Sequence, residues 1–122
     1  MRSEYSRSSS PEWVLESQKV RAVFSSQDGG RWMEFTWKDT GVNFLPEGGA
    51  WAAPGPVEVR AAGDTLEFAG PGWKRTVTLA GSRLRAEQTT QLPPDPLMPE
   101  RRAGTVLEVR REGPNRVTYS LE

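Results

Sequence analysis

Apolar and polar residues alternate most regularly between Trp73 and Leu92, on both sides of the dipeptide Gly81-Ser82. Two-residue loops of this kind commonly join the strands of a β-hairpin. With the loop at Gly81-Ser82, the facing pairs are Ala80 with Arg83, Leu79 with Leu84, Val77 with Ala86, Arg75 with Gln88 and Trp73 with Thr90. One face then collects Trp73, Val77, Leu79, Leu84 and Ala86, whereas the other face is polar. Because side chains alternate between the two faces of a strand, the stretch is predicted to be a half-buried antiparallel hairpin.

Three further stretches show the same period of two. The first runs from Lys19 to Ser25, turns at residues 27–30 and continues from Arg31 to Trp37. In its second half, one face is expected to hold Met33, Phe35 and Trp37, and the other Trp32, Glu34 and Thr36. The second stretch pairs residues 57–61 with 65–69, which sets Val59 opposite Phe68 and Ala61 opposite Leu66. The third pairs residues 105–111 with 116–121, which sets Leu107 opposite Leu121 and Val109 opposite Tyr119. Gly and Asp in the intervening turns favour hairpins at each of these places.

Four segments lack this alternation. Residues 1–10 are polar and serine-rich and are predicted to be a disordered tail or linker. Ser10-Pro11-Glu12 is typical of a helix start of one or two turns, with an extended segment that packs Trp13 on the domain as the alternative. Residues 42–56 and 93–104 are rich in Gly and Pro. The former is predicted to be a long irregular connection and the latter a semi-extended loop or edge.

The pattern as a whole predicts an all-β fold. It contains about eight short strands, turn residues between most of them and almost no helix. We expect an antiparallel β-sandwich, with an eight-stranded barrel as the alternative. The 122 residues suit one domain, expected to span residues 11–122 and to form part of a larger protein.

The composition excludes several kinds of chemistry. Sixteen basic residues balance sixteen acidic ones, so neither nucleic acid nor a membrane is expected as a partner. No apolar run approaches the ~20 residues of a membrane-spanning helix. The absence of Cys and His removes thiolate nucleophiles, imidazole bases and the usual zinc ligands. We therefore expect a domain that is not an enzyme and needs no cofactor or metal, whereas the composition does not indicate a compartment.

A series of short motifs lies between Val20 and Leu92. In order along the chain they are DGGR at 28–31, WKDTG at 37–41, NFLP at 43–46, RTVTL at 75–79 and LRAEQTT at 84–90. This order resembles the opening of galactose-mutarotase-like β-supersandwich domains, which also occur as accessory domains of glycoside hydrolases. Domains of that family are usually much longer, and its enzymes use histidine, which this chain lacks. The resemblance therefore implies a sugar-associated or packing domain rather than an epimerase.

Five tryptophans are a high number for a domain of this size. An exposed indole beside carboxylates or amides offers a sugar ring a flat apolar face and hydrogen-bonding partners. Trp32 is the candidate on a strand, because it is expected on the less apolar face with Glu34. Trp51 is the candidate in a loop, with Asn43 and Glu47 nearby in the sequence. The predicted carbohydrate-binding site therefore consists of Trp32, Glu34, Asn43, Glu47 and Trp51. The alternative for each indole is a place in the core or at an interface.

Acidic residues could in principle form a catalytic pair or a metal site. Glycoside hydrolysis needs two carboxyl groups about 5–10 Å apart in one cleft. Asp28, Asp39, Glu34 and Glu47 are the acids available for such a pair, but turn formation fully explains Asp28 and Asp39. No acid-rich calcium-loop motif is present. No catalytic or metal-binding residue is therefore predicted.

Basic residues are expected to form a solvated sheet face. Arg83 and Arg85 are expected on opposite faces of their strand. Lys74, Arg85 and Arg110 would form a basic patch only if their strands are neighbours. No series of aromatic residues suited to stacking nucleic-acid bases accompanies them.

Two functions are consistent with these observations, and a third, a barrel that carries a small apolar ligand, would require a closed sheet with an internal cavity. The first is a non-catalytic module of a larger protein that binds carbohydrate or supports a neighbouring carbohydrate-active domain. The alternative is a structural or protein-interaction domain without a small-molecule ligand, whose exposed aromatic residues contact a partner or a second copy. The expected partners are accordingly carbohydrate and neighbouring domains of the parent chain.

Overall fold

The computed structural model describes residues 12–53 and 57–122, which form eleven β-strands and no helix. The strands make two antiparallel sheets, in the orders β1-β2-β3-β4 and β5-β6-β7-β8-β11-β10-β9. The smaller sheet contains β1 (Glu12–Glu16), β2 (Val20–Ser25), β3 (Arg31–Trp37) and β4 (Val42–Asn43). The larger contains β5 (Glu58–Ala62), β6 (Thr65–Gly70), β7 (Trp73–Ala80), β8 (Arg83–Gln88), β9 (Glu100–Arg102), β10 (Thr105–Arg111) and β11 (Arg116–Leu121). Two separate open sheets confirm the predicted β-sandwich and exclude the barrel, and the described elements include no helix able to cross a membrane.

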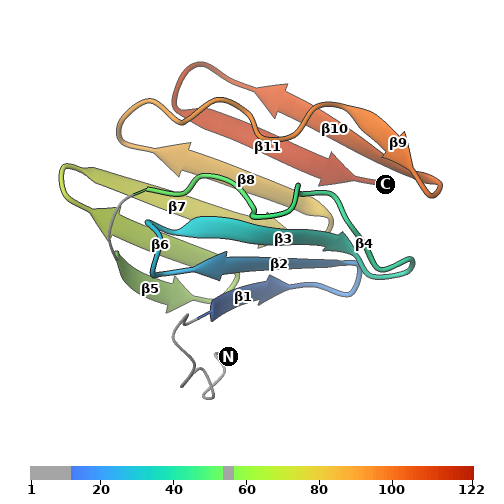
Figure 1. Cartoon of the computed structure of the whole chain (residues 1–122), viewed down its shortest axis with the longest axis horizontal. Helices are drawn as coiled ribbons and strands as arrows, with labels where there is room; N and C mark the ends of the chain where they lie inside the picture. Colours follow the sequence, from blue (N-terminus) through green and yellow to red (C-terminus); the bar gives the residue numbers. More distant parts are fainter. Residues whose placement is uncertain (1–11, 54–56) are drawn as a thin grey trace.

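The core lies between the two sheets. Figure 1 shows the smaller sheet, in blue to teal, across the face of the larger sheet, with the segment after β4 crossing in front of β8. Because four strands cannot cover seven, loops complete the cover. Their buried apolar residues are Phe44, Leu45, Trp51, Leu92 and Leu97. A sandwich with one sheet this much smaller therefore depends on its irregular segments for burial of the core.

The hairpins of the larger sheet have the predicted registers. In the central hairpin Leu79 lies opposite Leu84 and Val77 opposite Ala86, and all four side chains are buried. The other pairs found as predicted are Ala80 with Arg83, Arg75 with Gln88, Val59 with Phe68, Ala61 with Leu66, Leu107 with Leu121 and Val109 with Tyr119. Short Gly-containing turns fix the register of each hairpin, and the buried face opposes any slip by one residue.

The prediction that Trp32 lies on the outer face of its strand is wrong, because β3 contains a bulge. Val23 pairs with Glu34, but the next residue, Phe24, pairs with Trp32, which leaves Met33 as an extra residue. A bulge sets two residues of one strand against one of the partner and shifts the alternation by one position. Trp32 and Phe35 therefore both face the core, where both are fully buried.

The short strands lie in segments where the sequence pattern is weak. Residues 12–16, predicted as the start of a helix, form β1, so the extended alternative is the one found, and Trp13 packs against the core. Val42–Asn43 pairs with β3 inside the connection predicted to be irregular, and β9 is an edge strand within the Pro-rich segment. The predicted tail at residues 1–10, which includes Ser10 of the predicted helix start, and the following Pro11 lie outside the described residues.

The connection after β4 is attached to β3 by a short bridge. The Trp32 N–H donates to the Ala50 carbonyl at 2.7 Å, and the Ala50 N–H donates to the Trp32 carbonyl at 2.8 Å. The next residue, Trp51, has a φ of 63°, a left-handed conformation that is uncommon outside glycine. This conformation accompanies an indole that is buried in the core instead of facing solvent.

Candidate functional site

The two tryptophans of the predicted carbohydrate site are core residues. Trp32 has 0% and Trp51 has 5% of its surface exposed, and their ring centroids are 4.9 Å apart. Trp32 also contacts the rings of Phe24, Phe35 and Tyr119, with centroids 5.2 to 6.0 Å away. Neither indole presents an open face on which a sugar ring could stack.

The polar members of the predicted site lie apart from these indoles. Glu34 lies on the outer face of the smaller sheet, with its carboxylate 3.5 Å from Arg21 Nε. Asn43 Oδ1 accepts main-chain hydrogen bonds from β3 and from the loop after β4, at 2.9 and 3.0 Å. Glu47 is exposed in that loop. The five residues therefore do not form one surface, and carbohydrate binding stays a prediction without a located site.

A buried arginine was missed by the sequence analysis. Arg75 is 3% exposed, and its guanidinium carbon lies 5.1 Å from the ring centroids of both Trp51 and Trp73. Its Nε donates to Gln88 Oε1 at 2.8 Å, whereas Nη1 has no hydrogen-bond partner among the described residues. Burial lowers the pKa of Arg75, because the charged guanidinium loses its hydration. Two indole faces partly replace that hydration, so Arg75 is a cation held within the core.

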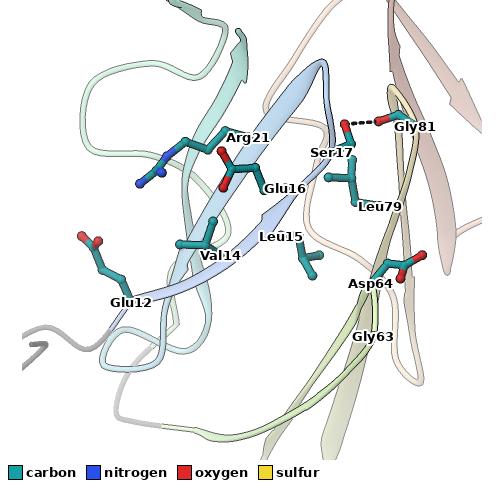
Figure 2. A pocket seen from close by; sticks show the side chains of 10 residues that line it. All are labelled: Glu12, Val14, Leu15, Glu16, Ser17, Arg21, Gly63, Asp64, Leu79 and Gly81. Atoms are coloured by element: carbon teal, nitrogen blue, oxygen red, sulfur yellow. Dashed lines mark hydrogen bonds between the residues drawn. The ribbon is translucent and has the colours of Figure 1, made fainter. Parts of the chain in front are cut away.

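A hollow in the described part of the chain runs along β1. It encloses about 650 Å³ between β1 and two turns of the larger sheet, the β5–β6 turn and the β7–β8 turn. Its walls include Val14, Leu15 and Leu79, as well as the charged residues Glu12, Glu16, Arg21 and Asp64. Figure 2 shows a hydrogen bond at one end, where the Ser17 hydroxyl donates to the Gly81 carbonyl at 2.7 Å. This bond holds the turn after β1 against the β7–β8 turn.

One wall of the hollow is an unpaired sheet edge. Strand β1 is the first in its sheet, and within residues 12–53 and 57–122 its one strand partner is β2. The Ser17 N–H donates to the Val20 carbonyl, which makes this pair a hydrogen-bonded one. Hydrogen-bonded and non-hydrogen-bonded pairs alternate in antiparallel sheets, so the main-chain groups of Glu12, Val14 and Glu16 point away from β2. These three residues also line the hollow, which therefore offers N–H and C=O groups together with side chains.

The charges around the hollow are mainly negative. Glu16 lies 2.9 Å from Lys38 Nζ, and this hydrogen bond is the largest cause of the lowered pKa of Glu16. Arg21 lies beside Glu34 on the outer face, so both of these lining charges have partners. Glu12 and Asp64 make no ion pair with another described residue, and Figure 2 shows their carboxylates extending from different walls. The hollow therefore keeps two carboxylates that an incoming cation could meet.

A smaller hollow of about 290 Å³ lies on the outer face of the larger sheet. Arg83, Arg85 and Arg110 line it together with Glu108 and Glu112. The prediction that Arg83 and Arg85 occupy opposite faces is wrong, because positions two apart on a strand share a face. Strands β8 and β10 are separated by β11, yet Arg85 and Arg110 border the same hollow. Its mixture of signs is that of a solvated sheet face.

No cluster among the described residues has the composition of a metal centre. No three acidic side chains within residues 12–53 and 57–122 are arranged to hold a metal ion. Three of the four acids considered for catalysis pair with a nearby cation: Asp28 with Arg31 at 3.1 Å, Asp39 with Lys19 at 3.3 Å and Glu34 with Arg21 at 3.5 Å.

A polar cluster attaches the Pro-rich segment to the larger sheet. Asp95 accepts hydrogen bonds from Arg111 Nη1 and, at 2.9 Å, from the Tyr119 hydroxyl. Burial raises the pKa of Tyr119 well above its usual value, and the hydrogen bond to Asp95 raises it further. The cluster is thus a fixed structural contact that depends on a protonated tyrosine.

We expect Tyr119 to make the fold sensitive to alkali. Tyrosine in the unfolded chain ionises near pH 10.0, whereas the folded protein keeps the proton to higher pH. Above pH 10 the unfolded state therefore binds fewer protons, and stability falls by up to about 1.4 kcal/mol per pH unit. In Tyr119→Phe, the lost hydrogen bond is expected to cost about 1 kcal/mol at pH 7, but the decline above pH 10 is expected to be shallower. Urea unfolding at a series of pH values measures both effects, and equal slopes for the two proteins would contradict the assignment.

Comparison with known proteins gives no family for this chain. No protein-family model, curated protein or solved structure matches it. The resemblance to galactose-mutarotase-like domains therefore stays a prediction, and the hollow along β1 is the candidate site that the structure itself provides.

Proposed function

We propose that this chain is a non-catalytic β-sandwich interaction domain that binds an extended polypeptide segment of a partner along β1. The observation that carries the proposal is that the β1 edge, which has no further strand partner among the described residues, forms one wall of a hollow of about 650 Å³. A segment that enters the hollow could pair with the outward main-chain groups of Glu12, Val14 and Glu16 and thereby extend the smaller sheet. The volume of the hollow, about 650 Å³, offers room for side chains of such a segment.

The chemistry of the site supports a polypeptide over a small molecule. The lining combines exposed main-chain groups with scattered charges, whereas small-molecule sites are mainly apolar and enclosed. Strand addition uses main-chain hydrogen bonds for affinity and side-chain contacts for specificity. The β1 edge supplies the main-chain hydrogen bonds, and the walls around it supply the side-chain contacts.

A substitution at Val14 tests this mode of binding. Peptides selected from a random displayed library are expected to bind the unmodified protein and to lose binding to Val14→Pro. Proline removes the edge N–H of residue 14 and leaves the β1–β2 hydrogen bonds in place, and edge strands tolerate it for this reason. Val14→Thr is the matched control, because it is also β-branched but keeps the N–H.

The readout must separate lost binding from lost folding. Far-UV circular dichroism checks that Val14→Pro is folded, and amide chemical shifts of the unmodified protein map the bound peptide independently. We expect the shifts to change at Glu12, Val14, Glu16 and Gly81. Selection of no peptide, or shift changes confined to the outer face of the larger sheet, would overturn the proposal.

Carbohydrate binding is the second candidate. It is favoured by three indoles that are only half-buried, namely Trp13, Trp37 and Trp73. Titration with soluble glucans, xylans and monosaccharides, followed by tryptophan fluorescence and amide shifts, tests it directly. The absence of any response across this panel would remove the candidate and leave the peptide-binding proposal untouched.

A further inference from the structure

We infer that the segment bound along β1 is an amphipathic strand, with cationic side chains on one face and apolar side chains on the other. This inference rests on the proposed function and specifies the partner of that same site. Antiparallel or parallel addition to β1 would continue both faces of the smaller sheet into the added strand. The residues on each face of β1 therefore determine which side chains the added strand should carry.

The outer face of β1 favours cations. Glu12, Val14 and Glu16 alternate with the core-facing residues of the strand, so both glutamates lie on the outer face of β1, and both line the hollow. Asp64 adds a third carboxylate from the β5–β6 turn, and Glu12 and Asp64 lack ion pairs within the described chain. Against these three acids the lining has one cation, Arg21, which is already beside Glu34. Lysine or arginine at alternate positions of an added strand would meet this excess of negative charge.

The inner face of β1 favours apolar side chains. Leu15 is 4% exposed and Leu79 is 3% exposed, and both border the hollow from the core side. Apolar residues of the added strand would extend this surface over the open margin of the sandwich and remove apolar area from water. The added strand should therefore have cationic and apolar residues at alternate positions.

The same charges disfavour a second copy of this chain as the occupant. Antiparallel pairing of two β1 strands about Val14 would place Glu12 opposite Glu16 of the second copy, twice in each dimer. Parallel pairing in register would place each glutamate opposite its own counterpart. Like charges directly opposite each other destabilise a strand pair, and natural edge strands use charge to prevent self-association. Charge repulsion therefore disfavours pairing between two β1 edges and favours a strand of opposite charge.

Three synthetic peptides slightly longer than β1 test the inference on the full chain. The first alternates lysine with valine, the second alternates glutamate with valine, and the third has the composition of the first in two separate blocks. We expect only the first to bind, with the other two at least about tenfold weaker, since charge and alternation are both required. Exposed charge pairs are screened by salt, so its affinity should fall as ionic strength rises from about 0.05 to about 0.5 M.

Matched variants locate the charge effect. Each exposed ion pair is worth about 0.2–1 kcal/mol, so Glu12→Gln and Asp64→Asn should each weaken binding about 1.4- to fivefold. Glu108→Gln, on the outer face of the larger sheet, is the control and should leave the affinity unchanged. Amide shifts of the bound protein should again change along β1.

The outcomes separate this inference from the proposed function. Equal binding of all three peptides, or no effect of Glu12→Gln and Asp64→Asn, would overturn the cationic strand. If library-selected peptides bind at β1 but the lysine–valine peptide does not, only this inference fails. If neither selected nor designed peptides bind, the proposed function fails as well.

Discussion

Replacing Trp32 with alanine is expected to lower the free energy of unfolding by about 3–5 kcal/mol, the range measured for large aromatic residues removed from cores. Trp32 is fully buried and contacts four aromatic rings, those of Phe24, Phe35, Trp51 and Tyr119. These rings come from both sheets and from the connection after β4. The surrounding strands cannot move in to fill the cavity without breaking the strand pairing within each sheet. A loss of this size is a large part of the 5–15 kcal/mol typical of a whole domain.

Trp37 on the same strand provides the control for Trp32. It is half-buried at the margin of the core, with Lys19 Nζ 5.8 Å from its ring centroid. Trp37→Ala should cost roughly 1–2 kcal/mol, because less apolar area returns to water. Urea unfolding followed by far-UV circular dichroism measures both variants without depending on tryptophan emission. Similar losses for the two variants would contradict a core centred on Trp32.

The sequence was sufficient to predict the hairpins of the larger sheet. Gly63-Asp64 and Gly81-Ser82 fix each register locally, and alternation then assigns every side chain to a face. Residues Val77 and Leu84 are buried as expected, because nothing interrupts the period of two between them and their turn. A hairpin of this kind is predictable because its information is contained within some twenty neighbouring residues.

The smaller sheet was less predictable because its alternation is interrupted. The extra residue Met33 reverses the faces of the residues before it, and no local composition marks a bulge at that position. The candidate sugar-binding residue Trp32 was assigned to the wrong face for this reason alone. Its aromatic neighbours come from distant segments, so only the tertiary structure shows the environment of its indole.

The buried position of Arg75 could have been predicted from the alternation of residues along β7. It shares odd-numbered positions with Trp73, Val77 and Leu79, so strict alternation places its side chain on the core face. A charged residue at such a position is unexpected, because burial of an unpaired cation is costly. The two indoles that accept it could not be identified from the sequence, since Trp51 comes from a connection without any periodic pattern.

The hollow along β1 depends on sheet order, which the sequence does not specify. The position of β1 at the margin, opposite the turns of the larger sheet, results from how the two sheets pack. Glu12 and Asp64 are 52 positions apart in the numbering and line the same hollow. A site assembled from an edge and two turns therefore leaves no motif in the sequence.

Gly49→Ala is expected to lower the free energy of unfolding by about 3 kcal/mol or more. Gly49 has a φ of +76°, where an alanine costs about 1–2 kcal/mol. An added Cβ would also lie 2.3 Å from the Trp32 carbonyl oxygen, a main-chain atom that cannot rotate away. Relief of this contact requires the bridge between Trp32 and Ala50 to open, with the loss of two hydrogen bonds. Amide hydrogen exchange at Trp32 and Ala50 should therefore accelerate along with the loss of stability.

A substitution at the neighbouring Gly48 distinguishes the cost of backbone strain from the cost of the contact between Cβ of residue 49 and the Trp32 carbonyl oxygen. Its φ is +89°, but a Cβ there would meet no atom within 4 Å, so Gly48→Ala carries the strain without the clash. The difference between the two variants in urea unfolding then measures what contact between the connection and β3 contributes. We expect Gly48→Ala to cost about 1–2 kcal/mol and to leave exchange at Ala50 slow. Equal effects would mean that the bridge does not hold Trp51 in the core, and the loop after β4 would then fold independently of β3.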